Sequence, residues 1–314
     1  MTLLFRDPVF QKHDTGRHPE TAERLRSINA RLEKSGLAGD CQAGTCKPIA
    51  EEEVTQVHDP RMVLRARQMA EHGGGHLDAD TIISADSFQV ALTAAGTGAA
   101  AVDAVLAGKA PNALCLIRPP GHHATPTRSM GFCMFNNIAL AARHARKIHH
   151  LTRILIVDFD VHHGNGTQDI FYEDPEVLFF SIHRYGNGFY PGSGAASETG
   201  KGRGLGFTLN VPVAFGTAPP DYHKGFTAAL EKAADKIKPE LVLVSAGFDA
   251  HARDPIGSLG LETEDFATLT HQVLDVARTH AHGRLVSCLE GGYHLAALAE
   301  SVQMHLEELL HYRP

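Results

Sequence analysis

The densest group of metal-binding side chains lies in the stretch Val157-Asp-Phe-Asp-Val-His-His-Gly-Asn-Gly166. The aliphatic run Ile154–Val157 at its start is typical of a strand that is buried on both faces. Side chains two apart in a strand share a face, so we expect Asp160 and His162 to converge, with Asp158 just behind them. A carboxylate and an imidazole together favour a divalent metal, zinc first, although an isolated pair would equally fit a buried hydrogen bond.

Three other predicted strands are also followed by side chains that suit catalysis. In chain order these side chains are the tandem His122-His123, then Asp249, then Tyr293. The carboxyl ends of parallel strands meet at one edge of a sheet, where ligands bind, so we expect all of them to gather beside the Asp-x-His pair. With Asp249, that pair would form a three-ligand metal site that keeps one coordination position open, as catalytic sites do.

These residue types together suit metal-assisted hydrolysis of an amide. A water in the open position would lose its proton near neutral pH. One of the tandem histidines, His122 or His123, could take that proton and return it to the leaving group, and Asp158 could orient a histidine. Tyr293 follows two glycines and could donate its hydroxyl to the oxyanion that forms at the carbonyl.

The elements that must position these residues alternate along the chain. Apolar runs of strand length cover residues 113–117, 154–157, 177–182, 207–211, 241–244 and 285–289. Helical patterns cover residues 18–36, 87–108, 136–149, 221–238, 263–280 and 294–312. Strands that alternate with helices predict an α/β fold with a central, mostly parallel sheet and helices on both faces. No linker or repeat interrupts the pattern, so we expect a single domain over residues 1–314.

Composition excludes several function classes. The net charge of −7 and the lack of a Lys/Arg run argue against a nucleic-acid partner. The first eight residues have no basic start, and we expect neither a signal peptide nor an apolar run of membrane-spanning length. Five cysteines are an odd number and predict reduced thiols of the cytoplasm, with Cys133 and Cys288 in the core. Among the 21 histidines, His149 and His150 are expected to be solvated at a helix end.

Five ordered motifs and an N-terminal signature resemble the zinc-dependent histone deacetylase family, in its class II-like bacterial branch. The resemblance covers nearly the whole chain. The motifs are Arg118-Pro-Pro-Gly-His-His-Ala124, Gly131-Phe-Cys-Met-Phe-Asn-Asn137, Val157-Asp-Phe-Asp-Val-His-His-Gly-Asn-Gly-Thr-Gln168, Ser245-Ala-Gly-Phe-Asp249 and Glu290-Gly-Gly-Tyr293, and the signature is His18-Pro-Glu-Thr-Ala-Glu-Arg-Leu25. The resemblance implies an arginase/deacetylase fold and hydrolysis of an acetylated amine to acetate and free amine.

The resemblance also implies roles for particular residues. It makes His123 the general base and acid, His122 its electrostatic companion paired with Asp158, and Tyr293 the group that polarises the carbonyl. The implied zinc ligands are Asp160, His162 and Asp249. The implied walls of the substrate tunnel are Phe132 and Tyr190, with Gly131 between them. The implied ligands of a second ion, potassium, are Asp158, Asp160, His162, Ser181 and Ile182.

Two positions depart from relatives of the family. Asn165 stands where class I members have an Asp behind the general base, so His123 should have a lower pKa here than beside an Asp. Ile256 stands where a polyamine-selective relative has a Glu. A cationic polyamine would lose that carboxylate, which favours acyl-lysine in proteins or peptides, or small acyl-amines, as substrate.

Other functions remain open at this level. An acetylpolyamine amidohydrolase would keep the fold, and the Gly-rich segment His72–Asp80 could then be a flexible rim loop whose Asp78 or Asp80 binds substrate, or a plain surface loop. An arginase-like enzyme with two manganese ions needs more carboxylates near Asp249 than the chain has. A silent acyl-lysine reader is opposed by the intact catalytic set. Iron(II) in place of zinc, and a homo-oligomer, are both compatible with the sequence.

Overall fold

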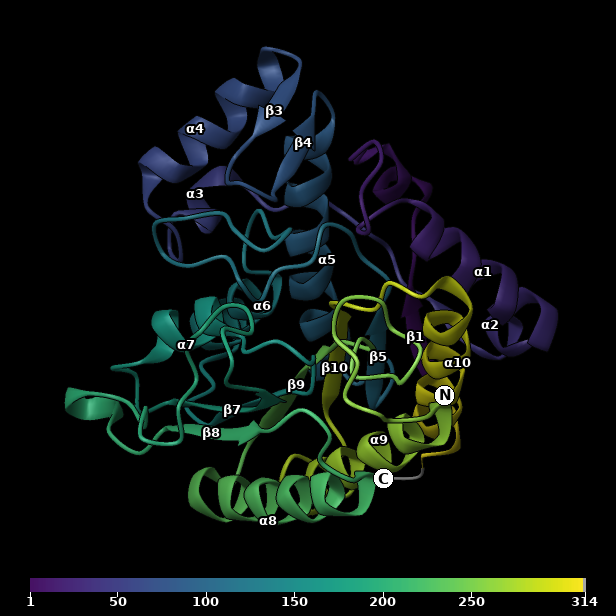
Figure 1. The fold of residues 1–314 in the computed structure, drawn as a ribbon, viewed down its shortest axis with the longest axis vertical. Coiled ribbons are helices and arrows are strands. Elements are labelled where there is room, and N and C mark those ends of the chain that lie inside the picture. The colour runs from purple at the N-terminus through teal and green to yellow at the C-terminus, as the bar shows by residue number, and fades with distance from the viewer. Residues whose placement is uncertain (313–314) are drawn as a thin grey trace.

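The fold is seen in a computed structural model that describes residues 1–312 (Figure 1). Within these residues the main sheet has eight strands, and every pairing is parallel. Their order across the sheet is β2 (Gln42–Ala43), β1 (Thr2–Phe5), β5 (Asn112–Cys115), β10 (Leu285–Leu289), β9 (Leu241–Ala246), β6 (Ile154–Asp158), β7 (Val177–Arg184) and β8 (Thr208–Val213). The six predicted strands are confirmed, and the prediction missed the two short strands β1 and β2.

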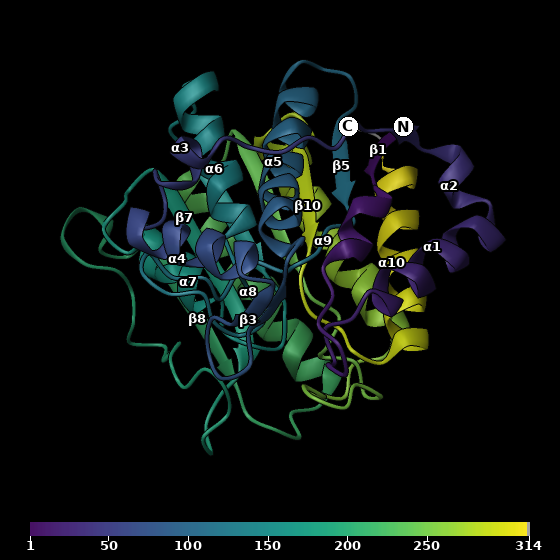
Figure 2. The ribbon, with the colours of Figure 1, turned by 90° about the horizontal axis from the view of Figure 1, so that it is seen from above.

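Ten α-helices are present in the described part of the chain. They are α1 (Glu23–Ser35), α2 (Leu37–Asp40), α3 (Glu51–Val54), α4 (Pro60–Glu71), α5 (Ser87–Leu106), α6 (Asn137–His149), α7 (Asn165–Phe171), α8 (Pro219–Ile237), α9 (Thr263–His280) and α10 (Leu295–His311). The α5, α6 and α7 helices pack on one face of the sheet, and α8, α9 and α10 on the other, with α1 against α10 (Figures 1 and 2). Helices on both faces explain why the central strands are apolar throughout.

Local signals explain where two helices begin. The α4 helix, which the sequence analysis missed, starts at Pro60 after Asp59, whose carboxylate accepts a hydrogen bond from the backbone N–H of Arg61. The α9 helix starts at Thr263, as expected, but its N-cap is Glu262. The carboxylate of Asp265 accepts a hydrogen bond from the backbone N–H of Glu262 at 2.7 Å, which satisfies one of the free donors at this helix start.

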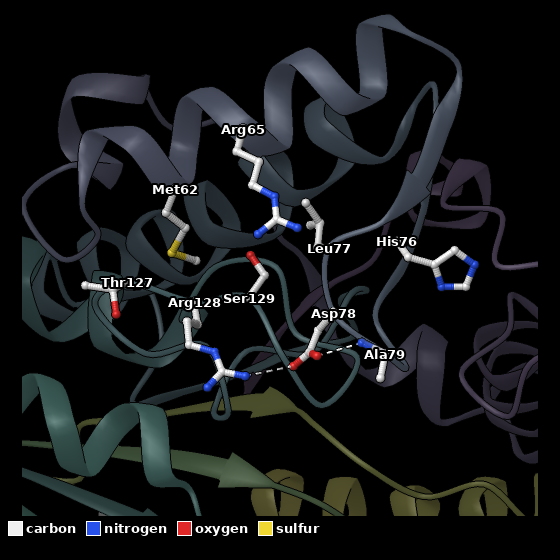
Figure 3. Close-up of a pocket in the computed structure, with 9 residues that line it drawn as sticks. All are labelled: Met62, Arg65, His76, Leu77, Asp78, Ala79, Thr127, Arg128 and Ser129. Carbon is white, nitrogen blue, oxygen red and sulfur yellow. Dashed lines mark hydrogen bonds and ion pairs between the residues drawn. The ribbon is translucent and has the colours of Figure 1, made fainter.

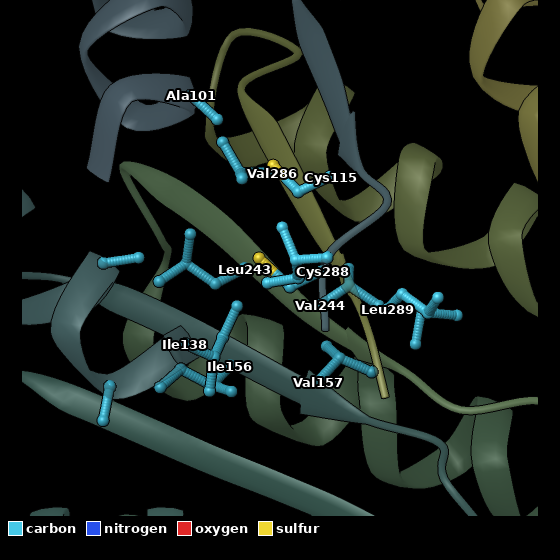
Figure 4. Close-up of a cluster of buried hydrophobic side chains, with 14 of the residues drawn as sticks. Ala101, Cys115, Ile138, Ile156, Val157, Leu243, Val244, Val286, Cys288 and Leu289 are labelled. Carbon is cyan, nitrogen blue, oxygen red and sulfur yellow. The ribbon is translucent and has the colours of Figure 1, made fainter. Parts of the chain in front are cut away.

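One part of the core lies between the sheet and the pair of helices α5 and α6 (Figure 4). Ile156 of β6, Leu243 of β9 and Val286 of β10 are fully buried, as are Ile138 of α6 and Ala101 of α5. Cys133 and Cys288 are also buried, which confirms the prediction that they pack in the core. The fold therefore presents a rigid layer beneath the carboxyl edge of the sheet.

The expectation that no apolar run reaches membrane-spanning length was wrong for α5. By length and composition alone, its 20 residues are long and apolar enough to cross a membrane. However, 78% of the apolar window is buried inside the protein. At Gly98 a Cβ atom would lie 3.4 Å from the Cβ of Ala141 on α6. The apolar character of α5 is thus explained by close packing in the core.

Candidate active site

Four strand ends bring the predicted site together. The loop after β6 carries Asp160 and His162, and the loop after β9 carries Asp249. One donor atom from each of these three side chains lies within 4.8 Å of the other two, and all three residues are buried. Asp160 and His162 lie beyond β6, which ends at Asp158, so the turn after the strand places them and not the strand alternation that we had assumed.

Backbone N–H groups hold the two carboxylates, and the carboxylates hold the ring of His162. The Nδ1 atom of His162 lies 3.1 Å from Asp160 Oδ1 and 3.1 Å from Asp249 Oδ2. The N–H of Gly291 donates to Asp160 Oδ2 at 2.8 Å, and the N–H of Val161 donates to Asp249 Oδ1 at 2.8 Å. The donors are therefore oriented before any ion binds, which is what a precise metal site requires.

Two glycines make room for the carboxylates. A Cβ atom on Gly247 would lie 2.1 Å from Asp160 Oδ2. A Cβ atom on Gly291 would lie 2.2 Å from Asp249 Oδ2 and 2.5 Å from Asp160 Oδ2. Any other residue at these positions would displace the carboxylates, which gives the two glycines of the Ser245–Asp249 and Glu290–Tyr293 motifs a physical reason.

The electrostatics of the cluster fit a divalent cation. Burial and the nearby charge of Asp160 raise the pKa of Asp249 to about 7. Burial opposes the charge on His162, but hydrogen bonds to Asp160 and Asp249 raise its pKa to about 9. Two buried carboxylates beside one imidazole thus carry an excess of negative charge, which a bound cation would neutralise.

The tandem histidines have different partners. His122 Nδ1 lies 2.9 Å from Asp158 Oδ2, whereas His123 Nδ1 lies 2.7 Å from Asn165 Oδ1. Burial would lower the pKa of His122, but the carboxylates of Asp158 and Asp160 outweigh it and hold that pKa well above the usual value. Burial and the positive charges of His122 and His162 hold the pKa of His123 well below it. One member of the pair is therefore suited to stay charged and the other to accept a proton.

Glu290 fixes the loop that carries the histidines, and the sequence analysis assigned it no role. Its Oε2 atom accepts hydrogen bonds from the N–H groups of Gly121, at 2.7 Å, and His122, at 3.2 Å. Ser245 donates its hydroxyl to Oε1 at 3.1 Å. The Glu-Gly-Gly-Tyr motif therefore holds the loop after β5 as well as the residues of its own turn.

The predicted tunnel walls lie against His123 and Tyr293. The ring of Tyr190 meets that of His123 edge to face at 5.1 Å, and Phe132 meets Tyr293 in the same way at 5.6 Å. Gly131 has a φ of +57°, and a Cβ atom there would lie 2.5 Å from His123 Cδ2. The structure thus brings Gly131, Phe132 and Tyr190 together as expected.

Phe189 is a wall residue that the sequence analysis missed. Its ring stacks on that of His162 at 5.0 Å with an interplanar angle of 5°. It precedes Tyr190 directly, so two adjacent aromatic residues were the available signal.

Tyr293 is positioned by residues far away in the sequence. The guanidinium carbon of Arg24 lies 5.0 Å from the centre of its ring, and Arg24 Nε donates to the carbonyl of Gly292 at 2.7 Å. The N–H of Tyr293 donates to Asp254 Oδ2 at 2.7 Å, while Asp254 Oδ1 accepts from the N–H of Ile256 at 2.9 Å. Tyr293 and Ile256 are therefore linked through one carboxylate.

Three of the five residues implied for potassium lie on the neighbouring strands β6 and β7. Asp158 of β6 is in register with Ser181 of β7, and Ile182 follows it on the same strand. All three are buried. Ser181 also exchanges a hydrogen bond with His183 Nδ1 at 2.9 Å.

The Gly-rich segment forms an ordered hairpin and not a flexible loop. Residues Gly74–His76 (β3) pair with Ile82–Ser84 (β4) in antiparallel register. The turn borders a cavity of about 550 Å³, where Asp78 forms an ion pair with Arg128 at 3.5 Å (Figure 3). The same turn reaches the predicted tunnel wall, because the N–H of Phe132 donates to Thr81 Oγ1 at 3.2 Å.

An all-parallel sheet with buried histidine and carboxylate donors at its carboxyl edge is typical of an α/β metallohydrolase. The sequence model of the histone deacetylase domain matches residues 18–309. The chain therefore belongs to the histone deacetylase family, whose members are zinc-dependent.

Individual relatives agree with this assignment. The chain is 42% identical over 275 residues to the histone deacetylase-like amidohydrolase of Pseudomonas aeruginosa, which covers 88% of this chain and 71% of that protein. It is 46% identical over 303 residues to the human polyamine deacetylase HDAC10, covering 93% of this chain but only 44% of the human protein. The crystal structure of the HDA15 HD domain superposes with a TM-score of 0.93 at 35% identity, over 98% of this chain and 88% of that one.

Proposed function

We propose that this protein is a zinc-dependent deacylase that hydrolyses the amide of N-acetyl-lysine, or of a related small acyl-amine, to acetate and free amine. Membership in the histone deacetylase family makes the chain a hydrolytic deacetylase. The observation that carries the proposal is the convergence of three buried metal donors with a histidine pair that has one acidic and one neutral partner.

In this proposal Asp160, His162 and Asp249 hold the zinc. When bound, zinc supplies Lewis-acid polarisation of the amide carbonyl and lowers the pKa of a water towards ~7. The residues of the chain do the proton transfers. His123 donates its Nδ1–H to Asn165, which leaves the lone pair of Nε2 free to take a proton from water and to return it to the leaving amine.

His122 and Tyr293 stabilise charge in this scheme. His122, paired with Asp158, keeps its proton and contributes a fixed positive charge beside the reacting carbonyl. Burial, against the opposing charge of Arg24, raises the pKa of Tyr293, so its hydroxyl stays protonated and can donate to the carbonyl oxygen as negative charge develops there.

The tunnel supports a substrate with a methylene stem. Phe132 and Tyr190 offer apolar walls, and Gly131 keeps the space between them and His123 open. Ile256 offers no charge to a distal ammonium group, which favours acyl-lysine over acetylpolyamine.

One observation favours the polyamine alternative. Asp78 and Asp80 lie on the turn whose Thr81 accepts a hydrogen bond from the N–H of Phe132, so they could attract a cationic substrate to the tunnel. Burial, and then the charges of Asp80, Cys133 and Asp78, raise the pKa of Tyr190. The similarity to a protein named a polyamine deacetylase points in the same direction.

A substrate panel tests the proposal. The zinc-loaded protein is assayed with acetyl-lysine peptide, trifluoroacetyl-lysine peptide, acetylputrescine and acetylspermidine, with Tyr293→Phe as the inactive control. Turnover of lysine peptides well above that of polyamines is expected. Preference for polyamines that disappears in an Asp78→Asn/Asp80→Asn variant would establish the alternative. Binding of every substrate without cleavage would overturn both and indicate a silent reader.

The proposal includes a potassium ion held by Asp158, Asp160, His162, Ser181 and Ile182, partly through backbone carbonyls. The register between Asp158 and Ser181 supports it. Replacing potassium by sodium in the assay buffer should then change the thermal stability of the zinc-loaded protein, and an unchanged stability would argue against the site.

A cytoplasmic location and self-association are also part of the proposal. The five cysteines are free thiols, which supports the first. Fractionation of cells and sedimentation of the purified protein test the two points separately.

A further inference from the structure

A second group of metal-binding side chains lies outside the active site. Asp103 is in the last turn of α5, and His144 and His149 are on α6. The Nε2 atom of His144 lies 2.6 Å from Asp103 Oδ1, and the Nε2 atom of His149 lies 2.8 Å from the same oxygen. We infer that Asp103, His144 and His149 form a second divalent transition-metal site, which joins α5 to α6.

The donor set suits a transition metal. Two imidazole nitrogens and one carboxylate oxygen are ligands that zinc, nickel and copper accept, whereas calcium and magnesium prefer oxygen alone. One donor atom from each of the three side chains lies within 4.8 Å of the other two, the same criterion that the catalytic donors Asp160, His162 and Asp249 meet.

The surroundings of this second site favour a cation. Asp103 lies near the carboxyl end of α5, which ends at Leu106, and His149 is the last residue of α6. The carboxyl ends of two helices thus meet at one carboxylate, and each contributes partial negative charge. Close packing of α5 on α6 at Gly98 and Ala141 fixes the distance between the helices, so the ligands need little rearrangement.

The site has room for further ligands. The exposed fractions of the three side chains are 39% for Asp103, 14% for His144 and 28% for His149. Water can therefore complete the coordination. The site is separate from the catalytic one, because the amino end of α6 is the end that faces the catalytic loop, where Asn136 bonds to Ala124. The 13 residues of α6 put roughly 20 Å between the two ends.

A hydrogen-bonded cluster without metal is the alternative, and zinc titration separates the two. The holoenzyme, with its catalytic zinc in place, is dialysed against buffered zinc. A second equivalent per chain should bind and raise the melting temperature as the zinc concentration rises. Cobalt added to the zinc-loaded enzyme should give visible absorption from the same site.

Two variants and a control assign the site. A His144→Gln/His149→Gln variant should lose the second equivalent, the cobalt absorption and the zinc-dependent rise in melting temperature, and Asp103→Asn should weaken binding at least tenfold. His282→Gln, which removes an exposed imidazole in the turn before β10, should keep all three signals. Deacetylase activity should not change in any of them.

Either of two results would overturn the inference. One is a wild-type holoenzyme that binds no second equivalent of zinc. The other is a second equivalent that persists in the double histidine variant. Melting temperatures measured in EDTA show whether a variant is merely less stable, because that loss would not depend on zinc.

Discussion

His122 and His123 are neighbours in the chain, yet the pKa of His122 is raised and the pKa of His123 is lowered. Asp158 faces one ring and Asn165 the other, at 2.9 and 2.7 Å. The ring centres are only 4.0 Å apart, so a second proton on the pair would be opposed by the first. Against the effect of burial, the carboxylates of Asp158 and Asp160 raise the pKa of His122. Burial and the charges of His122 and His162 lower that of His123, so His123 is the member of the pair that can act as a base.

Replacing that amide should shift the pH profile. In Asn165→Asp a carboxylate would stabilise the charged form of His123 and raise its pKa. A general base works only when it is deprotonated, so the acidic limb of kcat/KM should move to higher pH, as a pH–rate profile would show. Asn165→Ala, which removes the acceptor, should not move the limb upward. An unmoved limb in the Asp variant would contradict the role of His123.

Removing one hydroxyl should separate catalysis from binding. Tyr293→Phe deletes a donor to the developing oxyanion, which typically costs about 10²–10³ in kcat. Zinc content and melting temperature should remain close to those of the wild type, because the backbone N–H that bonds to Asp254 is retained. Steady-state kinetics with acetyl-lysine peptide measure the change. A variant that kept most of its kcat would rule out this role.

At the scale of elements, buried ion pairs attach the N-terminal segment to the sheet. The guanidinium of Arg118, after β5, donates to both carboxylate oxygens of Glu20, at 2.5 and 2.7 Å, and to the carbonyl of Phe10 at 2.9 Å. Arg24 lies 3.3 Å from the same carboxylate. Burial opposes the charge of Glu20, but Arg118 holds its pKa well below the usual value. The segment that supports Tyr293 therefore depends on one carboxylate.

Breaking this contact should destabilise the whole fold. Glu20→Gln leaves two buried guanidinium groups without a negative charge, which typically costs about 3–5 kcal/mol in the free energy of unfolding. The exposed pair of Arg6 and Glu33 offers a matched control, because Glu33→Gln should cost about 1 kcal/mol or less. Urea unfolding compares them. Equal effects of the two substitutions would show that the buried pair has no special role.

At the scale of the whole molecule, buried neutral histidines make stability depend on pH. His58 donates from Nδ1 to the carbonyl of Thr125 at 2.8 Å and accepts at Nε2 from the N–H of Asn136 at 2.9 Å. An imidazole that accepts a hydrogen bond cannot be protonated there. Burial, partly offset by the bond to Thr125, lowers the pKa of His58 to about 4.

The consequence is a loss of stability in mild acid. Between the usual pKa near 6.5 and about 4, the unfolded chain binds a proton at His58 that the folded chain does not, so stability falls as pH falls. His58→Gln can make the same two bonds without titrating. From pH 7 to pH 5 the stability advantage of wild type over this variant should shrink by about 2 kcal/mol, measured by urea unfolding in EDTA. A constant difference would contradict the assignment.

The sequence by itself determined the chemistry and the strands that carry it. Asp160, His162, Asp249 and Tyr293 could be placed together because each follows an apolar run, and parallel strands bring their carboxyl ends to one edge whatever the details of packing. The motifs extended this to the tunnel walls. The local turn that carries Asp160 and His162 could not be read from a strand pattern, because the strand ends at Asp158.

Only the tertiary structure decided how distant segments support the site. Glu20 meets Arg118 across 98 residues, Arg24 meets Gly292 across 268, and Asp103 meets His149 across 46. His149 had been expected in solvent, and the Gly-rich segment had been expected to be either a flexible rim loop or a plain surface loop. Neither the contacts of His149 nor the hairpin can be predicted from a local sequence pattern, because they depend on how whole helices and strands pack. Periodicity shows only which face of an element is buried.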